Sequence, residues 1–197
     1  MTRDGGAHWT RQSIPPGVAS DGGYPGPYPY PLVWVSCLSS GLCRAGGGHL
    51  LGGDDSGFAY AVLVTSGPGR PWTCAQSAAT CTTLSPDAGD CPARTRCYGV
   101  QSTNPFGSST YAFGSTDGGA DWVEAGPEWT SVLNDIACPA ALTCYIAGSR
   151  GTAARITNGT TITAQRTPTA RDLYGIDCAG PATCHAVGDN GTILALG

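Results

Sequence analysis

The chain has 197 residues and a formal net charge of −4, and it contains ten cysteines. This sparse, mildly acidic charge argues against nucleic-acid binding, which needs a basic patch, so no nucleic-acid partner is expected. No apolar run approaches the ~18 residues that a membrane-spanning helix requires, so no membrane span is expected. The N-terminus lacks a basic segment followed by an apolar one, so we expect any secretion signal to be absent, removed or upstream.

The first motif along the chain is a turn pattern that recurs. Residues 2–9 (TRDGGAHW) and 115–122 (STDGGADW) follow S/T-x-D-x-G-x-x-W, and 65–72 (TSGPGRPW) follow it with Gly67 in place of Asp. The pattern predicts a tight hairpin, because Asp accepts backbone N–H bonds, Gly permits positive φ and Trp begins the next strand. The structural residues of the motif are Asp4, Gly6, Trp9, Asp117, Gly119, Trp122 and, in the degenerate copy, Trp72.

A Tyr/Pro/Gly-rich insert at residues 15–32 follows the first turn motif. Its tyrosines Tyr24, Tyr28 and Tyr30 alternate with prolines that stiffen the backbone, which makes them candidates for contact with a protein or a sugar. The alternative, which we favour, is a linker that runs over the surface and covers apolar groups.

Four copies of the pattern C-x5-C organise the rest of the chain. They begin at Cys37, Cys91, Cys138 and Cys178, at intervals of roughly 40–54 residues, which is typical of a repeat architecture. An even number of cysteines at repeating spacings favours a disulfide framework in an oxidising compartment. A reduced intracellular protein with buried thiols stays open as the alternative, whereas a zinc site is disfavoured by the spacing.

Two loops are further candidates. The stretch 47–58 (GGHLLGGDDSGF) is interpreted as a long loop, and its Asp54 and Asp55 lack the patterned oxygen ligands of a calcium site, so we expect a solvated turn. The second loop, residues 104–109 (NPFGSS), contains Phe106.

Together these motifs resemble known repeats. The turn pattern is similar to the Asp box, or BNR repeat, of sialidases and related propellers. The combination of C-x5-C, CHAVGDNGTILALG (184–197) and STDGGADW resembles more closely the photosystem II assembly and stability factor family and its bacterial relatives. The resemblance implies an all-β fold, a β-propeller of four-stranded antiparallel blades, in which Phe106 would line one face of the ring.

The repeats then divide one domain, 1–197, into blades. They cover about 32–76, 86–126, 132–166 and, for a composite fourth blade, 173–197 plus 1–14. In this scheme the N-terminal strand completes the last blade and closes a four-bladed ring. The alternative is an arc of a larger propeller, whose exposed edges and apolar faces predict self-association.

The C-x5-C spacing suits a disulfide between the first and second strands of a blade, because directly opposed residues of a hairpin bring their Cα atoms within bridging distance. The expected bridges are Cys37–Cys43, Cys91–Cys97, Cys138–Cys144 and Cys178–Cys184. A fifth bridge, Cys74–Cys81, is expected at the end of blade one.

The resemblance implies a non-catalytic module that binds a protein or glycan partner, and the cysteine framework predicts a secreted or extracytoplasmic location. No cofactor, metal or catalytic residue is expected. A sialidase-like glycoside hydrolase is one alternative. The Arg-Ile-Pro motif of that family is missing, since Ser13 precedes Ile14, and the two glutamates, Glu124 and Glu128, follow a turn motif on the predicted outermost strand. A structural repeat domain of a larger cell-surface protein is the other alternative.

Overall fold

A computed structural model describes residues 6–14, 32–50, 58–67, 70–75, 86–102 and 110–196. Several predicted residues lie outside these ranges, namely Asp4, Tyr24, Tyr28, Tyr30, Asp54, Asp55, Cys81 and Phe106. Within the ranges the regular elements are β-strands, apart from two short 3-10 turns, η1 (Ser149–Gly151) and η2 (Asp189–Gly191). No helix in this part of the chain is long and apolar enough to cross a membrane.

The strands form four antiparallel sheets in chain order, which we call blades one to four. Blade one contains β1 (Trp34–Cys37), β2 (Cys43–Leu50), β3 (Phe58–Thr65) and β4 (Thr73–Cys74). Blade two contains β5 (Ala88–Asp90), β6 (Cys97–Ser102), β7 (Thr110–Ser115) and β8 (Val123–Trp129). Blade three contains β9 (Leu133–Ala140), β10 (Thr143–Gly148), β11 (Ala153–Thr157) and β12 (Thr161–Gln165). Blade four contains β13 (Leu173–Gly180), β14 (Thr183–Gly188) and β15 (Thr192–Leu196).

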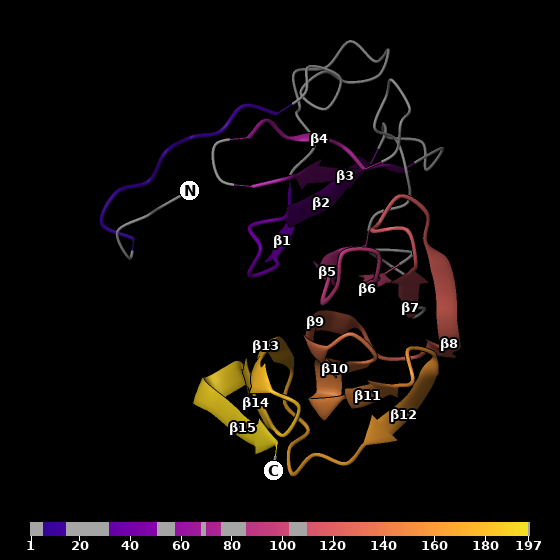
Figure 1. The fold of residues 1–197 in the computed structure, drawn as a ribbon. Helices are drawn as coiled ribbons and strands as arrows, with labels where there is room; N and C mark the ends of the chain where they lie inside the picture. The colour runs from indigo at the N-terminus through magenta and orange to yellow at the C-terminus, as the bar shows by residue number, and fades with distance from the viewer. Residues whose placement is uncertain are drawn as a thin grey trace.

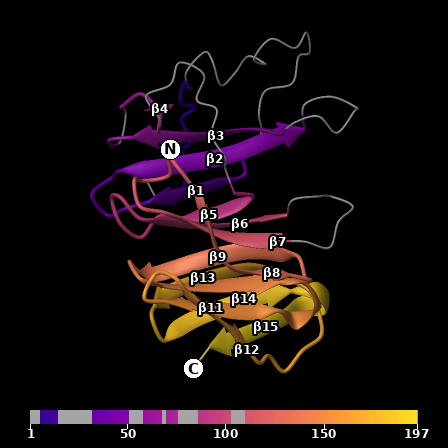
Figure 2. The same cartoon turned by 90° about the vertical axis from the view of Figure 1, so that its right-hand side faces the viewer.

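The blades follow one another around an open arc. Figure 1 shows β1, β5, β9 and β13 on its concave side, with β8 and β12 at the outer edge. Figure 2, turned by 90°, shows blade one above blade two, with blades three and four overlapping below them. The predicted all-β propeller fold of antiparallel blades is confirmed.

The apolar core lies between successive blades. Blades two and three enclose the largest cluster, in which Tyr98 and Val100 meet Ile136 and Ile146. Ile146 belongs to β10, and on the other side of that strand Ala147 packs with Leu173 and Ala186 of blade four. Strand β10 is therefore buried along nearly its whole length, because it has a neighbouring sheet on each face.

One predicted loop is wrong in part. Residues 47–50 continue β2, which pairs with β3 as far as Leu50 opposite Phe58, so this hairpin extends beyond the strand ends expected from the sequence. The run of glycines 46–48 suggests a loop because it shows no alternation of polar and apolar side chains. Glycine nevertheless donates and accepts ladder hydrogen bonds like any other residue except proline.

The N-terminal segment contacts blade one in the part of the chain that the structure describes. Its end lies beside blade one, where Trp72 Nε1 donates to Gln12 Oε1 at 2.8 Å and Ile14 packs against Leu63. Among the described residues, this segment forms no ladder with β15, and blade four has three strands. The predicted fourth strand includes residues 1–5, which lie outside the described ranges, so the composite blade stays a prediction. Blades one and four lie at the two ends of the arc (Figure 1), so contact with blade one keeps Gln12 and Ile14 at the end opposite to β15.

Candidate functional site

The concave side of the arc contains a hollow of about 580 Å³ between the first strands of all four blades. Polar groups dominate its lining, which includes Ser36 of β1, Asp90 of β5, Asp135 of β9 and Asp177 of β13. The hollow follows from the architecture, because the first strand of every blade faces the axis of a propeller.

Two of these carboxylates and the hydroxyl join one blade to the next. The backbone N–H of Cys91 donates to Ser36 Oγ at 2.9 Å, and that of Cys138 donates to Asp90 Oδ2 at 2.7 Å. Asp135 Oδ2 accepts from the N–H of Ile176 at 2.8 Å. Each contact satisfies a backbone donor of the following blade, so a polar side chain on one first strand fixes the position of the next.

The carboxylates lie close enough to influence one another. The pKa of the Asp135 carboxyl is raised above its ordinary value, chiefly by burial and further by the negative charges of Asp90 and Asp177, although the N–H groups of Ile176 and Ile136 favour ionisation. Accumulated negative charge of this kind disfavours anions and favours a cationic group at the concave face.

Sequence reasoning missed Asp90, Asp135 and Asp177 as site residues. A signal for two of them was present, because Asp90 and Asp177 each precede the first cysteine of a C-x5-C pair. Four predicted ligand-binding residues lie outside the described ranges, namely Tyr24, Tyr28, Tyr30 and Phe106. Their prediction as ligand-binding residues therefore stays a prediction.

The turn at residues 115–122 makes a dense hydrogen-bond network. Asp117 Oδ1 accepts from the N–H groups of Ala120 and Asp121, both at 3.0 Å, and from Ser115 Oγ at 2.7 Å. Loss of solvent contact works against ionisation of Asp117, but these hydrogen bonds outweigh it and lower the pKa of the carboxyl. Gly118 and Gly119 have φ of +83° and +90°, which explains why glycine occupies both positions.

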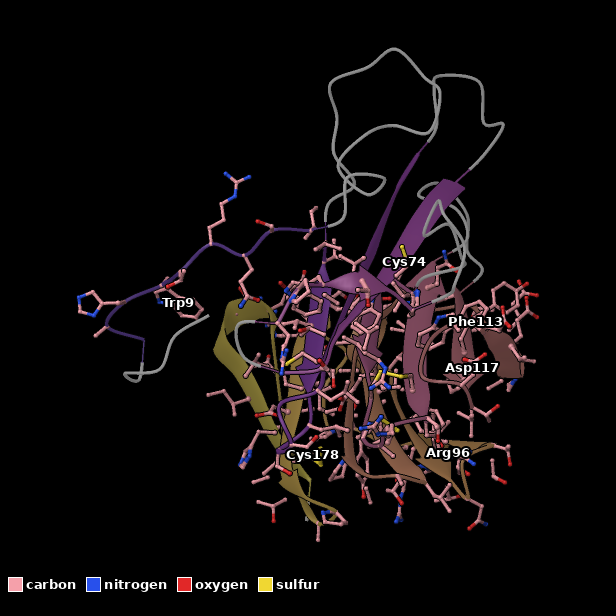
Figure 3. All side chains as sticks on the ribbon, turned by 45° about the horizontal axis from the view of Figure 1, so that its top comes forward. Trp9, Cys74, Arg96, Phe113, Asp117 and Cys178 are labelled. Carbon is pink, nitrogen blue, oxygen red and sulfur yellow. A yellow bond between two sulfur atoms is a disulfide. The ribbon has the colours of Figure 1, made fainter. Side chains whose placement is uncertain are left out.

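The tryptophan of this turn packs between blades one and two. Trp122 Nε1 donates to the carbonyl of Gly119 at 3.1 Å, and its ring meets Trp34 edge-on with centroids 6.4 Å apart. Figure 3 labels Asp117 within the sheets and Trp9 on the N-terminal segment that runs away from them. The turn motif at 115–122 thus belongs to the scaffold and not to the concave face.

Four predicted disulfides are present, Cys37–Cys43, Cys91–Cys97, Cys138–Cys144 and Cys178–Cys184, each with Cα atoms 4.0 Å apart. Two of the bridges join residues directly opposite in the ladder, Cys37 with Cys43 and Cys178 with Cys184. Cys74 is also disulfide-bonded, and its expected partner Cys81 lies outside the described ranges.

The two glutamates weighed for catalysis lie away from the concave hollow. Glu124 and Glu128 belong to β8, the last strand of blade two, at the far edge from the concave hollow. Across the described ranges, no group of three or more His, Cys, Asp or Glu side chains is arranged to hold a metal ion.

Comparisons with known proteins identify the fold. No family model and no curated protein matches the chain. Among solved structures, it is similar to "YCF48 bound to D1 peptide", with a TM-score of 0.54 and 16% sequence identity, over 84% of this chain and 50% of that one. YCF48 from Cyanidioschyzon merolae gives a TM-score of 0.54 and 14% identity over the same shares.

The chain thus spans about half the length of these solved structures. The likeness supports, at the level of the fold, the resemblance to propellers of the photosystem II assembly factor type. The chain is a β-propeller arc whose blades resemble those of YCF48.

Proposed function

We propose that the chain is a non-catalytic binding module whose concave face holds an extended, cationic segment of a partner protein. The observation behind the proposal is the hollow of about 580 Å³ lined by Asp90, Asp135 and Asp177. An extended peptide suits this shape, because its backbone can follow the row of first strands while basic side chains meet the carboxylates. A solved structure of similar fold contains a protein bound to a peptide, which supports this class of ligand.

The test measures the fluorescence anisotropy of two labelled decapeptides, one of alternating Arg and Ser and the other of alternating Glu and Ser. We expect the first to bind and the second not to. Asp177→Asn is expected to weaken binding by about threefold to fivefold, since an exposed ion pair contributes up to ~1 kcal/mol. Asp177 is exposed, so this substitution leaves the fold intact.

The matched control is Glu124→Gln, which removes the same charge from the outer strand β8. It should leave peptide affinity unchanged. Equal binding of both peptides, or equal effects of the two substitutions, would contradict the proposed face. Binding should also weaken on acidification and begin to do so above the ordinary range of an aspartate, because the pKa of Asp135 is raised.

A location outside the cytoplasm forms part of the proposal. It is supported by the four hairpin disulfides, because such bridges persist in oxidising compartments. The measurement is the intact mass after iodoacetamide treatment, with and without prior reduction, of protein taken from its own cell. An unreduced chain that takes up no alkyl groups supports the location, and one that takes up ten contradicts it.

A further inference from the structure

Each of blades one to three contacts the next blade through the side chain that follows its second cysteine. We call the side of a blade that meets the next blade its forward face, and the opposite side its backward face. The contacts made to the following C-x5-C loop are Arg44 to the carbonyl of Arg94, Tyr98 to that of Ala141 at 3.0 Å, and Tyr145 to that of Pro181 at 2.5 Å. The first strands add the bonds from backbone N–H groups to Ser36, Asp90 and Asp135.

Blade four repeats both positions. His185 follows the second cysteine as Arg44, Tyr98 and Tyr145 do, and Asp177 precedes the first cysteine as Ser36 and Asp90 do. The two residues lie opposite each other in the β13–β14 ladder, so they share the forward face. Both are exposed. Asp177 Oδ1 accepts from the N–H of Cys178 at 2.8 Å, as Asp135 Oδ1 accepts from Ile136 while its Oδ2 holds blade four. Blade four thus presents the donor position that three blades use, and the acceptor position that blades one and two use, to hold a neighbour.

Apolar side chains complete this surface. Val187 and Ile193 are paired in the β14–β15 ladder and are 48% and 70% exposed. The equivalent of Val187 in blade three is Ala147, which is only 1% exposed because blade four covers it. Strand β14 alternates exposed and buried residues where β10 is buried throughout. The forward face of blade four therefore carries apolar side chains like those of the covered blade interfaces. No sheet covers it among the described residues.

The matching surface is the backward face of blade one. There Val35 of β1 is 63% exposed. Leu63 lies on the same side of the sheet, across Ala45 in the ladders, but it is buried because Ile14 and Trp72 cover it, so the open part of this face is the β1 edge. The loop from Leu38 to Leu42 occupies the place of the loops that accept bonds from Arg44, Tyr98 and Tyr145. The β1 edge and this loop of blade one therefore offer an exposed apolar side chain and a C-x5-C loop, the kinds of group that blades two to four offer to their predecessors.

We infer that the forward face of blade four, formed by Asp177, His185, Val187 and Ile193, binds the backward face of blade one of a second copy of this chain. The contact joins two different surfaces, so it forms a ring only if the rotation closes. Two copies related by a two-fold axis make the contact twice. Their combined length equals about one chain of the solved YCF48 structures, of which this chain spans half. Figure 1 shows the two surfaces at opposite ends of the arc.

The first experiment is sedimentation equilibrium over a range of concentrations. The expected particle has twice the chain mass of 20.0 kDa. A monomer at every concentration would overturn the inference, as would an open series of larger particles that never closes.

The second experiment places a charge in the contact. Ile193→Glu is expected to raise the dimer dissociation constant by ~100-fold, since each of the two contacts would bury an unpaired carboxylate and lose about tenfold. The matched control is Val123→Glu on β8, because Val123 is 71% exposed and lies outside the proposed contact. Both substitutions replace exposed side chains, so both variants should unfold like the parent chain. Equal effects of the two on dimerisation would overturn the inference.

The third experiment tests whether the two surfaces are different. Val35→Glu alters blade one and Ile193→Glu alters blade four, so each variant alone loses both contacts of the ring. A mixture of the two restores one unaltered contact, between blade four of one variant and blade one of the other. We expect the mixture to form a dimer with a dissociation constant between those of the parent and of either variant. A mixture no better than its components would show that each surface pairs with itself, and would overturn the inference.

Discussion

The two full copies of the turn motif end in tryptophans with opposite surroundings. Trp122 lies between blades one and two, where it meets Trp34. Trp9 ends the N-terminal copy and is 75% exposed. The same eight-residue pattern therefore produces a half-buried ring in one place and an exposed ring in another. The pattern specifies a turn, whereas burial depends on the neighbouring sheet.

The degenerate copy has a third environment. Trp72 donates to Gln12 and packs with Ile14 against Leu63, so a short chain segment covers this part of blade one in place of a sheet. The three tryptophans rank by how much structure surrounds them. Substitutions in the full copies should reproduce that ranking, from a large loss of stability at Trp122 to almost none at Trp9.

The largest effect is expected for Trp122→Ala. Removing a large half-buried ring leaves a cavity between blades one and two, which should lower the free energy of unfolding by about 3 kcal/mol. Urea unfolding followed by circular dichroism, with the disulfides oxidised, measures this loss. Trp122→Phe keeps most of the ring and gives up the bond to Gly119, so it should lose about 1 kcal/mol. Equal losses for the two variants would show that packing against Trp34 contributes little.

A smaller effect is expected for Gly119→Ala. The residue has φ of +90°, and an added Cβ would approach Val62 Cγ1 to 3.2 Å. Backbone strain and this contact together should cost about 2 kcal/mol. Gly6, at the same motif position in the first copy, has φ of +99° and no atom within 4 Å of an added Cβ. Gly6→Ala is therefore expected to cost at most ~1 kcal/mol, and a loss equal to that of Gly119→Ala would argue against the role of the neighbouring blade.

These contrasts explain how far the sequence predicts the structure. The C-x5-C hairpins and the strand order follow from local spacing, because residues six apart in a tight hairpin lie opposite each other. The hydrogen bond from the N–H of Cys138 to Asp90 does not follow in this way, since it joins residues of different blades whose distance depends on how the sheets stack. The position of residues 6–14 depends on the same stacking. Local pattern therefore predicts the blades, and the concave site arises from their arrangement.

The next effect in size is that of Asp117→Ala, which removes the acceptor at the centre of the turn. Asp117 is exposed, so its hydrogen bonds to Ala120, Asp121 and Ser115 should contribute about 1 kcal/mol in all. The pKa of its carboxyl is lowered in the folded chain from an ordinary 3.8. Its contribution is thus complete above that value and is lost as the pH falls through the folded pKa.

Unfolding measurements at pH 7 and at several values below 4 test this contribution. The difference between the parent chain and Asp117→Ala should be largest at pH 7 and should narrow on acidification. Asp117→Asn retains one acceptor oxygen, so its free energy of unfolding at pH 7 should lie between those of the parent chain and Asp117→Ala. A difference that is constant with pH would mean that the ionised carboxylate contributes nothing to the turn.

The smallest effect is expected for Trp9→Ala, and it decides between two positions of the N-terminal segment. In the open arc Trp9 is 75% exposed, so its removal should change the free energy of unfolding by less than ~0.5 kcal/mol. In a closed ring whose fourth blade is completed by residues 1–14, Trp9 would pack against a neighbouring blade as Trp122 does, and Trp9→Ala would lose ~3 kcal/mol. The measurement must be made at concentrations where the chain is monomeric, because a second copy can also bury this ring. A small loss in the monomer that becomes large at dimer concentrations would place Trp9 at the contact between two copies, whereas a large loss at all concentrations would favour the closed four-bladed ring.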